Sequence, residues 1–203
     1  MTRWYSEKKR EHFYKEAKRQ GYRARSAFKL KQIQKRFGVF SKEDIVIDLG
    51  AAPGGWSQVA KEFVGEKGIV IGADILSIKP LDNVQFIQGD ITENETIEEI
   101  KQILNDTKAD VVLSDMSPDI SGNYSVDQAR SLWLCERALE IAEQLLHPNG
   151  TFVCKNFEGV DTKKFIEKVK QRFSSVRIFT PDASRKSSSE IYIIAKSLKN
   201  IHT

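Results

Sequence analysis

The chain has 203 residues and a formal net charge of +4, which suits one soluble domain with a full hydrophobic core. No apolar run is long enough to span a bilayer, and the charged N-terminus lacks the apolar stretch of a signal peptide. Cys135 and Cys154 show no CxxC spacing and the three histidines are scattered, so we expect no disulfide framework, no metal site and a cytoplasmic, reducing location.

Positive charge is concentrated at the start of the chain. Residues 1–36 hold 13 Lys and Arg against 3 Asp and Glu, so the rest of the chain has a balance of −6. Aromatic residues are interleaved with these cations: Trp4, Tyr5, Phe13, Tyr14 and Tyr22. This mixture suits phosphate contacts and stacking on unpaired bases. A solvated basic helical face is the plain alternative, but the acidic remainder of the chain favours a nucleic-acid partner.

Two helices are predicted in this basic segment. Residues 3–19 form a polar helix, and a second helix runs over 26–37 and ends at Gly38, a residue type common just after helices. Lys29 lies at the margin of the apolar stripe of the second helix, where a lysine whose ammonium extends to solvent is the usual interpretation. We expect residues 1–38 to be an arm on a single domain, with a core over 39–197 and a tail over 198–203.

The remaining pattern alternates strands with helices. Strands are predicted at 45–48, 68–73, 83–88, 109–114, 151–154, 175–180 and 190–195, and helices from Trp56 onward and over 94–104, 126–146 and 161–172. Such alternation predicts a doubly wound, mostly parallel α/β sheet of seven strands with helices on both faces. The loop between the last two strands is too short for a crossover helix, so these strands should pair antiparallel.

The first strand leads into a turn of small residues, Gly50-Ala-Ala-Pro-Gly-Gly55, before the next helix. Ligands of α/β sheets bind beyond the carboxyl ends of the strands, where glycines allow close approach to helix N-terminal N–H groups. The spacing is not G-x-G-x-x-G, and a purely structural turn remains an alternative. We interpret the turn as a possible cofactor seat.

Polar residues follow the ends of the predicted strands: Asp48, Asp74, Asp90, Asp115 and Lys155. Asp74 comes about two dozen residues after the turn, where an acid accepts hydrogen bonds from a ribose. Asp90 could accept from the amine of an adenine. These carboxylates would repel a pyrophosphate, so the pattern favours an adenosine that carries a cation.

Several motifs together resemble one family. They are Asp48-Leu-Gly-Ala-Ala-Pro-Gly-Gly-Trp-Ser-Gln58, Ser114-Asp-Met-Ser-Pro118, Ser121-Gly122 with Asp127, Lys155, Ser184-Arg185, Ser189-Glu-Ile-Tyr192 and the basic Tyr22-Arg-Ala-Arg-Ser-Ala-Phe-Lys-Leu30. From Tyr22 to Ala195 the chain resembles the FtsJ-type S-adenosylmethionine-dependent RNA ribose 2′-O-methyltransferases. The resemblance implies a Rossmann-like class I methyltransferase fold, S-adenosyl-L-methionine as cofactor, and RNA as partner.

The resemblance also implies roles for individual residues. The catalytic tetrad of the family carries over to Lys29, Asp115, Lys155 and Glu190. Its cofactor contacts carry over to Gly54, Trp56, Asp74, Asp90 and Asp115. RNA contacts are expected from Arg23, Arg25 and Lys29, and no metal is expected. Ser117, Asp119 and Thr180 depart from the residues usual in the family, which puts substrate details near these loops in doubt but not the chemistry.

The chemistry of the tetrad can be argued from its side chains. A sulfonium methyl group is already activated, so positioning and deprotonation of the accepting hydroxyl are most of the catalysis. We assign Lys155 as general base. Lys29 would assist it or stabilise the forming alkoxide, while Asp115 and Glu190 would orient the ammonium groups and the hydroxyl.

The resemblance implies large-subunit ribosomal RNA, the commonest substrate of the family, as the first choice of substrate and transfer RNA as the second, and we expect a monomer. A non-catalytic RNA-binding or ribosome-assembly factor is the alternative from another class, and the intact tetrad argues against it. A nucleotide-dependent oxidoreductase is disfavoured by the glycine spacing and the acidic residues at the strand ends.

Overall fold

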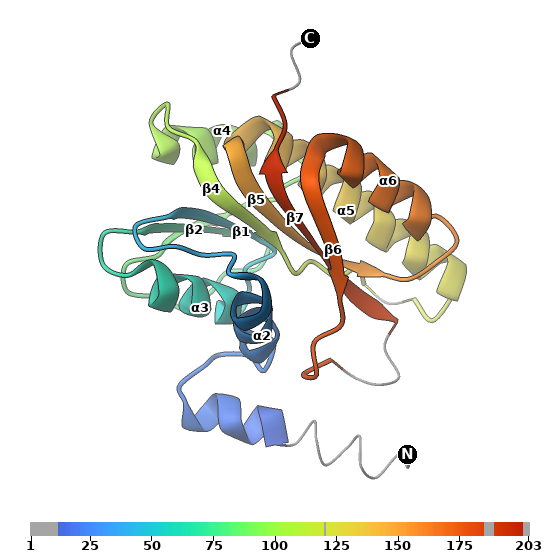
Figure 1. The fold of residues 1–203 in the computed structure, drawn as a ribbon. Coiled ribbons are helices and arrows are strands. Elements are labelled where there is room, and N and C mark those ends of the chain that lie inside the picture. The colour runs from blue at the N-terminus through green and yellow to red at the C-terminus, as the bar shows by residue number, and fades with distance from the viewer. Residues whose placement is uncertain (1–11, 120, 185–188, 201–203) are drawn as a thin grey trace.

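The computed structural model describes residues 12–119, 121–184 and 189–200. Its strands are β1 (Ile45–Leu49), β2 (Ile69–Asp74), β3 (Gln85–Gln88), β4 (Ala109–Ser114), β5 (Leu146–Phe157), β6 (Phe173–Phe179) and β7 (Glu190–Leu198). Its helices are α2 (Ala27–Phe37), α3 (Gly55–Val64), α4 (Asn94–Leu104), α5 (Tyr124–Leu145) and α6 (Thr162–Arg172), preceded by a helical stretch over 12–19. The strands form one sheet in the order β3-β2-β1-β4-β5-β7-β6 (Figure 1).

The sheet is parallel except at β7, which runs antiparallel to both β5 and β6. The predicted seven-stranded, mostly parallel α/β fold with an antiparallel final pair is therefore confirmed. Several boundaries differ by one to three residues, and the largest difference is at β5, which begins at Leu146, where we expected a helix end followed by a break. The pairing Ala109↔Leu146 is followed by Val111↔Thr151, so the residues around Pro148 form an irregularity within the strand.

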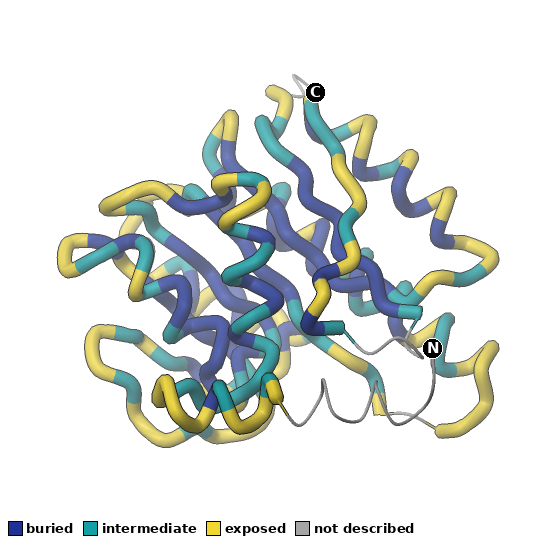
Figure 2. The backbone as a smooth tube through the Cα atoms, turned by 60° about the horizontal axis from the view of Figure 1, so that its bottom comes forward, coloured by how far each residue is buried: buried dark blue, intermediate teal, exposed yellow. Residues whose placement is uncertain are grey.

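Two hydrophobic clusters cover the two faces of the sheet. One packs β-strand residues against α4, α5 and α6, and the other packs the alternate residues against α2 and α3. On β5, for example, Phe152 and Cys154 belong to the first cluster and Val153 to the second. Buried backbone runs through the centre of the sheet, while exposed positions lie on the outer sides of the helices and in the loops (Figure 2). The alternation of strand residues between the two clusters follows from the two-residue period of a strand.

The N-terminal segment is joined to α3. Of the predicted helix 3–19, residues 12–19 are helical and 3–11 lie outside the described residues, as do Trp4 and Tyr5. The second predicted helix is α2. Gln58 of α3 accepts from the Arg23 backbone N–H at 2.9 Å and donates to the Gly21 carbonyl at 3.0 Å, which fixes the chain between the two helices.

None of the helices in the described part of the chain combines the length and the apolar character needed to cross a membrane. Among these same residues, His, Cys, Asp and Glu side chains form no group of three or more that could hold a metal ion.

Candidate active site

Three residues of the expected tetrad lie on one face of the sheet because of strand alternation. Asp115 is two residues beyond Leu113 on β4, Lys155 is two beyond Val153 on β5, and Glu190 is two before Tyr192 on β7. Leu113, Val153 and Tyr192 all belong to the cluster that packs against α2 and α3. Lys29 is on α2, so all four residues meet on this side of the sheet.

The four side chains form two ion pairs. Lys29 Nζ lies 2.5 Å from Glu190 Oε1, and Lys155 Nζ lies 3.2 Å from Asp115 Oδ1. Lys155 Nζ also donates to the Asp115 backbone carbonyl at 2.5 Å. Lys29, Lys155 and Glu190 are buried, so Lys29 is not the solvent-directed boundary lysine that helical periodicity alone suggested.

Tyr192 links the two pairs, and sequence reasoning placed it in a motif without giving it a role. Its hydroxyl donates to Asp115 Oδ1 at 2.8 Å, and Lys29 Nζ lies 5.6 Å from its ring centroid. The β5–β7 register sets Lys155 opposite Tyr192 and Phe157 opposite Glu190. The signal that could have found Tyr192 is its position two residues after Glu190, on the same strand face.

Burial and neighbouring charges act on the acids of this cluster. Burial acts to raise the pKa of Glu190, but the Lys29 ammonium, by charge and hydrogen bond, together with Ser184 and the Lys155 charge, lowers that pKa below its ordinary value. Burial, with the nearby Asp115 and Glu190 charges, raises the pKa of Tyr192 well above its usual range. Glu190 is therefore an anion and Tyr192 a neutral hydrogen-bond donor at neutral pH.

A cavity of about 430 Å³ opens beside the cluster at the carboxyl ends of β1 to β4. It is lined by Gly50, Ala52, Ala73, Asp74, Ile75, Leu76, Gly89, Asp90, Ile91, Thr92, Asp115, Met116, Ser117, Asp119, Trp133 and Leu134. This lining includes four aspartates and neither Lys nor Arg, with apolar walls beside them. Its size is that of a small-ligand site, and its charge favours a cationic ligand.

Backbone hydrogen bonds hold two of these carboxylates in place. Asp74 accepts from the N–H groups of Ala52 and Leu76 at 2.9 and 2.8 Å, and Asp90 accepts from Thr92 N–H at 2.8 Å. Each carboxylate has further lone pairs for a ligand. Asp74, Asp90 and Asp115 thus line the cavity, as expected of residues that contact the cofactor.

Gly54 and Trp56, the other expected cofactor contacts, do not line this cavity. The Trp56 ring is buried against Tyr192, with a centroid distance of 5.7 Å, and its Nε1 donates to the Ser26 carbonyl at 2.9 Å. Trp56 therefore fixes the start of α2 against α3. Because both residues are at the N-terminus of α3, a cofactor contact by their backbone N–H groups stays a prediction.

Asp48 does not line the cavity either. Its carboxylate is fully buried and accepts from the Ser57 hydroxyl at 2.7 Å. Burial raises the pKa of Asp48 to about 7, and the negative charges of Asp115 and Asp74 act in the same direction. Asp48 thus secures the turn that follows β1 from beneath.

Trp133 is a lining residue that the sequence did not indicate. The helical pattern of 126–146 identified its buried face, and Trp133 of α5 is on another face, with 54% of its surface exposed. It reaches the cavity together with Leu134 only because α5 passes beside the loop after β3. Arg137, one turn further along α5, donates to the carbonyls of Ile91 and Thr92 in that loop.

The expected RNA contacts Arg23 and Arg25 lie between the helical stretch 12–19 and α2. The Arg23 guanidinium donates to the backbone carbonyls of Pro53, Lys79 and Pro80. It thus contacts the turn after β1 and the loop after β2. Arg25 is partly buried, and its contact with RNA stays a prediction.

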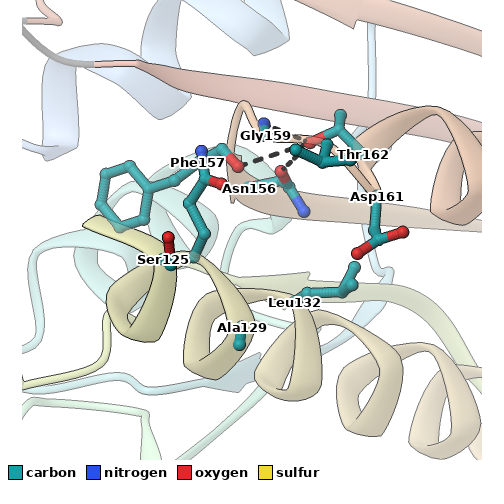
Figure 3. Close-up of a pocket in the computed structure, with 10 residues that line it drawn as sticks. Ser125, Ala129, Leu132, Asn156, Phe157, Gly159, Asp161 and Thr162 are labelled. Atoms are coloured by element: carbon teal, nitrogen blue, oxygen red, sulfur yellow. Dashed lines mark hydrogen bonds between the residues drawn. The ribbon is translucent and has the colours of Figure 1, made fainter. Parts of the chain in front are cut away.

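A smaller cavity of about 160 Å³ lies between α5 and the loop from β5 to α6 (Figure 3). Asn156, Thr162 and Leu132 are among the residues that line it, and Thr162 Oγ1 donates to Asn156 Oδ1 at 3.2 Å. Asn156 shares its strand face with Cys154, whereas Lys155 faces the α2 side. This cavity is therefore on the opposite face from the tetrad.

The sheet order, the acidic cavity at the switch between β1 and β4, and the paired lysines define a Rossmann-like protein with an acidic ligand cavity beside two buried lysines.

Comparison with known proteins indicates one family. The model of the FtsJ-like methyltransferase family matches residues 22–198. Ribosomal RNA large subunit methyltransferase E of Methanothrix thermoacetophila is 52% identical over 93% of this chain and 73% of its own length, and that of Marinobacter nauticus is 46% identical over 98% and 96%. The structure of a Plasmodium falciparum protein described as a ribosomal RNA methyltransferase superposes with a TM-score of 0.81 at 33% identity, covering 87% of this chain and 98% of that one. The chain belongs to the FtsJ-like methyltransferase family.

Proposed function

We propose that this enzyme transfers a methyl group from S-adenosyl-L-methionine to a ribose 2′-hydroxyl of large-subunit ribosomal RNA. The observation that carries the proposal is the meeting of Lys29, Asp115, Lys155 and Glu190 at the edge of a cavity suited to an adenosine with a cationic chain. An RNA-binding factor without catalysis would have no use for two buried lysine–carboxylate pairs, since buried charges are costly.

The residues of the cavity fit S-adenosyl-L-methionine. Asp74 would accept from the ribose hydroxyls, Asp90 from the adenine amine and Asp115 from the amino group of the methionine part. The apolar side chains of Ile91, Met116, Trp133 and Leu134 would cover the adenine. When bound, the sulfonium supplies a methyl group that is already activated for transfer to oxygen.

The protein residues then position and deprotonate the acceptor. Lys155 in its neutral form would take the proton of the ribose hydroxyl at Nζ, and Asp115 would hold that nitrogen in place. Glu190 fixes Lys29, whose ammonium would stabilise the negative charge that develops on the hydroxyl oxygen. Tyr192 orients the Asp115 carboxylate from below.

The proposed substrate rests on the relatives and on the basic segment. The proteins named above from Methanothrix thermoacetophila and Marinobacter nauticus carry large-subunit ribosomal RNA methyltransferase names. The first 36 residues of this chain hold 13 Lys and Arg, which suits a polyanionic partner. A ribosomal substrate also implies the cytoplasm as the site of action.

The test is incubation of the enzyme with methyl-labelled S-adenosyl-L-methionine and separate pools of ribosomal subunits, free ribosomal RNA and transfer RNA. We expect label in large-subunit RNA, and mass spectrometry of digested RNA should locate it on a ribose. Label on a base would refute the 2′-hydroxyl assignment, and label only in transfer RNA would refute the ribosomal substrate.

A further inference from the structure

Arg23 joins two segments that are far apart in the sequence. Its Nη1 donates to the Lys79 carbonyl at 2.5 Å and to the Pro53 carbonyl at 3.3 Å, and its Nη2 donates to the Pro80 carbonyl at 2.7 Å. Pro53 belongs to the turn between β1 and α3, whereas Lys79 and Pro80 belong to the loop after β2. One guanidinium therefore ties both segments to the N-terminal arm.

Both segments contribute to the cavity of about 430 Å³ that is proposed to hold the cofactor, which we call the cofactor cavity. Ala52 of the turn and Leu76 of the loop line it, and Asp74 is bonded to the N–H groups of both residues. A second cavity, of about 500 Å³, adjoins it and is lined by Arg23, Ala52, Pro53, Leu76, Ser77, Ile78 and Lys79. The loop is thus held at its beginning by Asp74 and near its middle by Arg23, and the residues between these two points line the second cavity.

Gly54 packs closely against Arg23 and against the loop after β2. A Cβ at Gly54 would lie 2.8 Å from Leu81 Cδ1 and 3.2 Å from Arg23 Nη1. The φ angle of Gly54 is +107°, a conformation that other residues rarely adopt. At this position the glycine turn leaves room for Arg23 and for the loop after β2.

We propose that Arg23 is a positioning residue of the cofactor site, and that the basic arm is part of the unit that binds the methyl donor. The proposal rests on the proposed function only in taking S-adenosyl-L-methionine as the ligand. A planar guanidinium can donate to several carbonyls in fixed directions, which a lysine ammonium cannot reproduce. These bonds give Arg23 a structural role beside the RNA contact that its sequence context suggested, and that RNA contact stays a prediction.

The test compares Arg23→Ala, Arg23→Lys and Arg36→Ala with the unaltered enzyme. Arg36 is exposed near the end of α2, so its replacement removes the same charge without touching the loop. By calorimetry without RNA, we expect Arg23→Ala to weaken S-adenosylhomocysteine binding about tenfold, Arg23→Lys to recover only part of it, and Arg36→Ala to leave it unchanged. In methyl-transfer assays the KM for S-adenosyl-L-methionine should rise while kcat stays nearly constant.

Hydrogen exchange of the ligand-free protein provides the second measurement. We expect Arg23→Ala to accelerate amide exchange in residues 75–81 and to leave α5 unaffected. Unchanged exchange there, or wild-type affinity for S-adenosylhomocysteine in Arg23→Ala, would overturn the proposal. If the unaltered enzyme binds no S-adenosylhomocysteine, the proposed function fails, while the exchange experiment still decides whether Arg23 holds the loop. If Arg23→Ala does not fold, Arg23→Lys, which keeps the positive charge, replaces it in both measurements.

Discussion

At the scale of single residues, two buried lysines face two carboxylates. Removing one partner of a buried pair leaves the other charge without compensation, which typically costs about 3–5 kcal/mol. Tyr192 reduces this cost at Asp115, because its hydroxyl donates to the same oxygen as Lys155. Replacement of Lys155 should therefore lower the rate of methyl transfer more than it lowers the free energy of unfolding.

Lys155→Ala should reduce methyl transfer by about 10²–10⁴-fold, the usual range for loss of a general base. Because the cofactor cavity does not include Lys155, the affinity for S-adenosylhomocysteine should stay within about twofold. Single-turnover rates and calorimetry measure the two quantities. Near wild-type turnover in this variant would exclude Lys155 as the base.

Asp48 makes stability depend on pH. Its pKa is raised to about 7 in the folded protein, whereas an unfolded aspartate titrates near 3.9. Between these values the folded state keeps a proton that the unfolded state releases, so the stability contributed by this group is complete below about pH 4 and is lost as the pH rises through 7.

Asp48→Asn removes this titration and keeps an acceptor for the Ser57 hydroxyl. The free energy of unfolding of the variant relative to the wild type should increase by about 2 kcal/mol between pH 5 and pH 7.5 and then level off. Urea denaturation at a series of pH values measures it. A difference that stays constant with pH would show that Asp48 has no raised pKa.

At the scale of elements, the turn after β1 is bonded to the neighbouring strand. The N–H groups of Gly50 and Ala51 both donate to the Ala73 carbonyl, at 2.9 and 3.2 Å. A Cβ at Gly50 would lie 2.4 Å from Met116 Cγ, and the φ angle of Gly50 is +74°. The approach of Met116 from the end of β4 thus requires a glycine here.

Gly50→Ala should destabilise the protein by about 2–4 kcal/mol, because it adds a steric clash to an unfavourable backbone angle. Gly21→Ala is the matched control, since Gly21 has a φ of +76° and open space around it. Gly21→Ala should cost only about 1 kcal/mol. Equal losses of melting temperature in the two variants would rule out the contact with Met116 as the cause.

At the scale of the whole molecule, positive charge is concentrated in the N-terminal segment and negative charge at the cavity. An anionic RNA should therefore approach from the arm, while the cavity should attract the proposed cationic cofactor. The arm is tied to α3 through Gln58 and to the loop after β2 through Arg23. The region proposed to bind RNA is thus joined by hydrogen bonds to the segments beside the proposed cofactor cavity.

Arg25→Ala should weaken binding to ribosomal RNA and lower the salt slope of the binding constant by about 0.7–0.9, the value for one lost phosphate contact. Lys164→Ala on α6 is the control, because α6 packs on the face of the sheet opposite to α2. Filter binding over a range of salt concentrations measures both slopes. An unchanged slope for Arg25→Ala would exclude this contact.

The sequence by itself determined the seven strands, their mostly parallel arrangement and the family, and the family resemblance named four residues, Lys29, Asp115, Lys155 and Glu190, whose catalytic roles stay a prediction. These features follow from local periodicity, from the shortness of the final loop and from ordered motifs, all of which can be read along the chain. Only the tertiary structure decided the burial of Lys29, the contacts of Tyr192, the entry of Trp133 into the cavity and the bonds of Arg23 to distant backbone carbonyls. Each depends on which elements become neighbours in space, and a periodic pattern identifies a face without naming what packs against it.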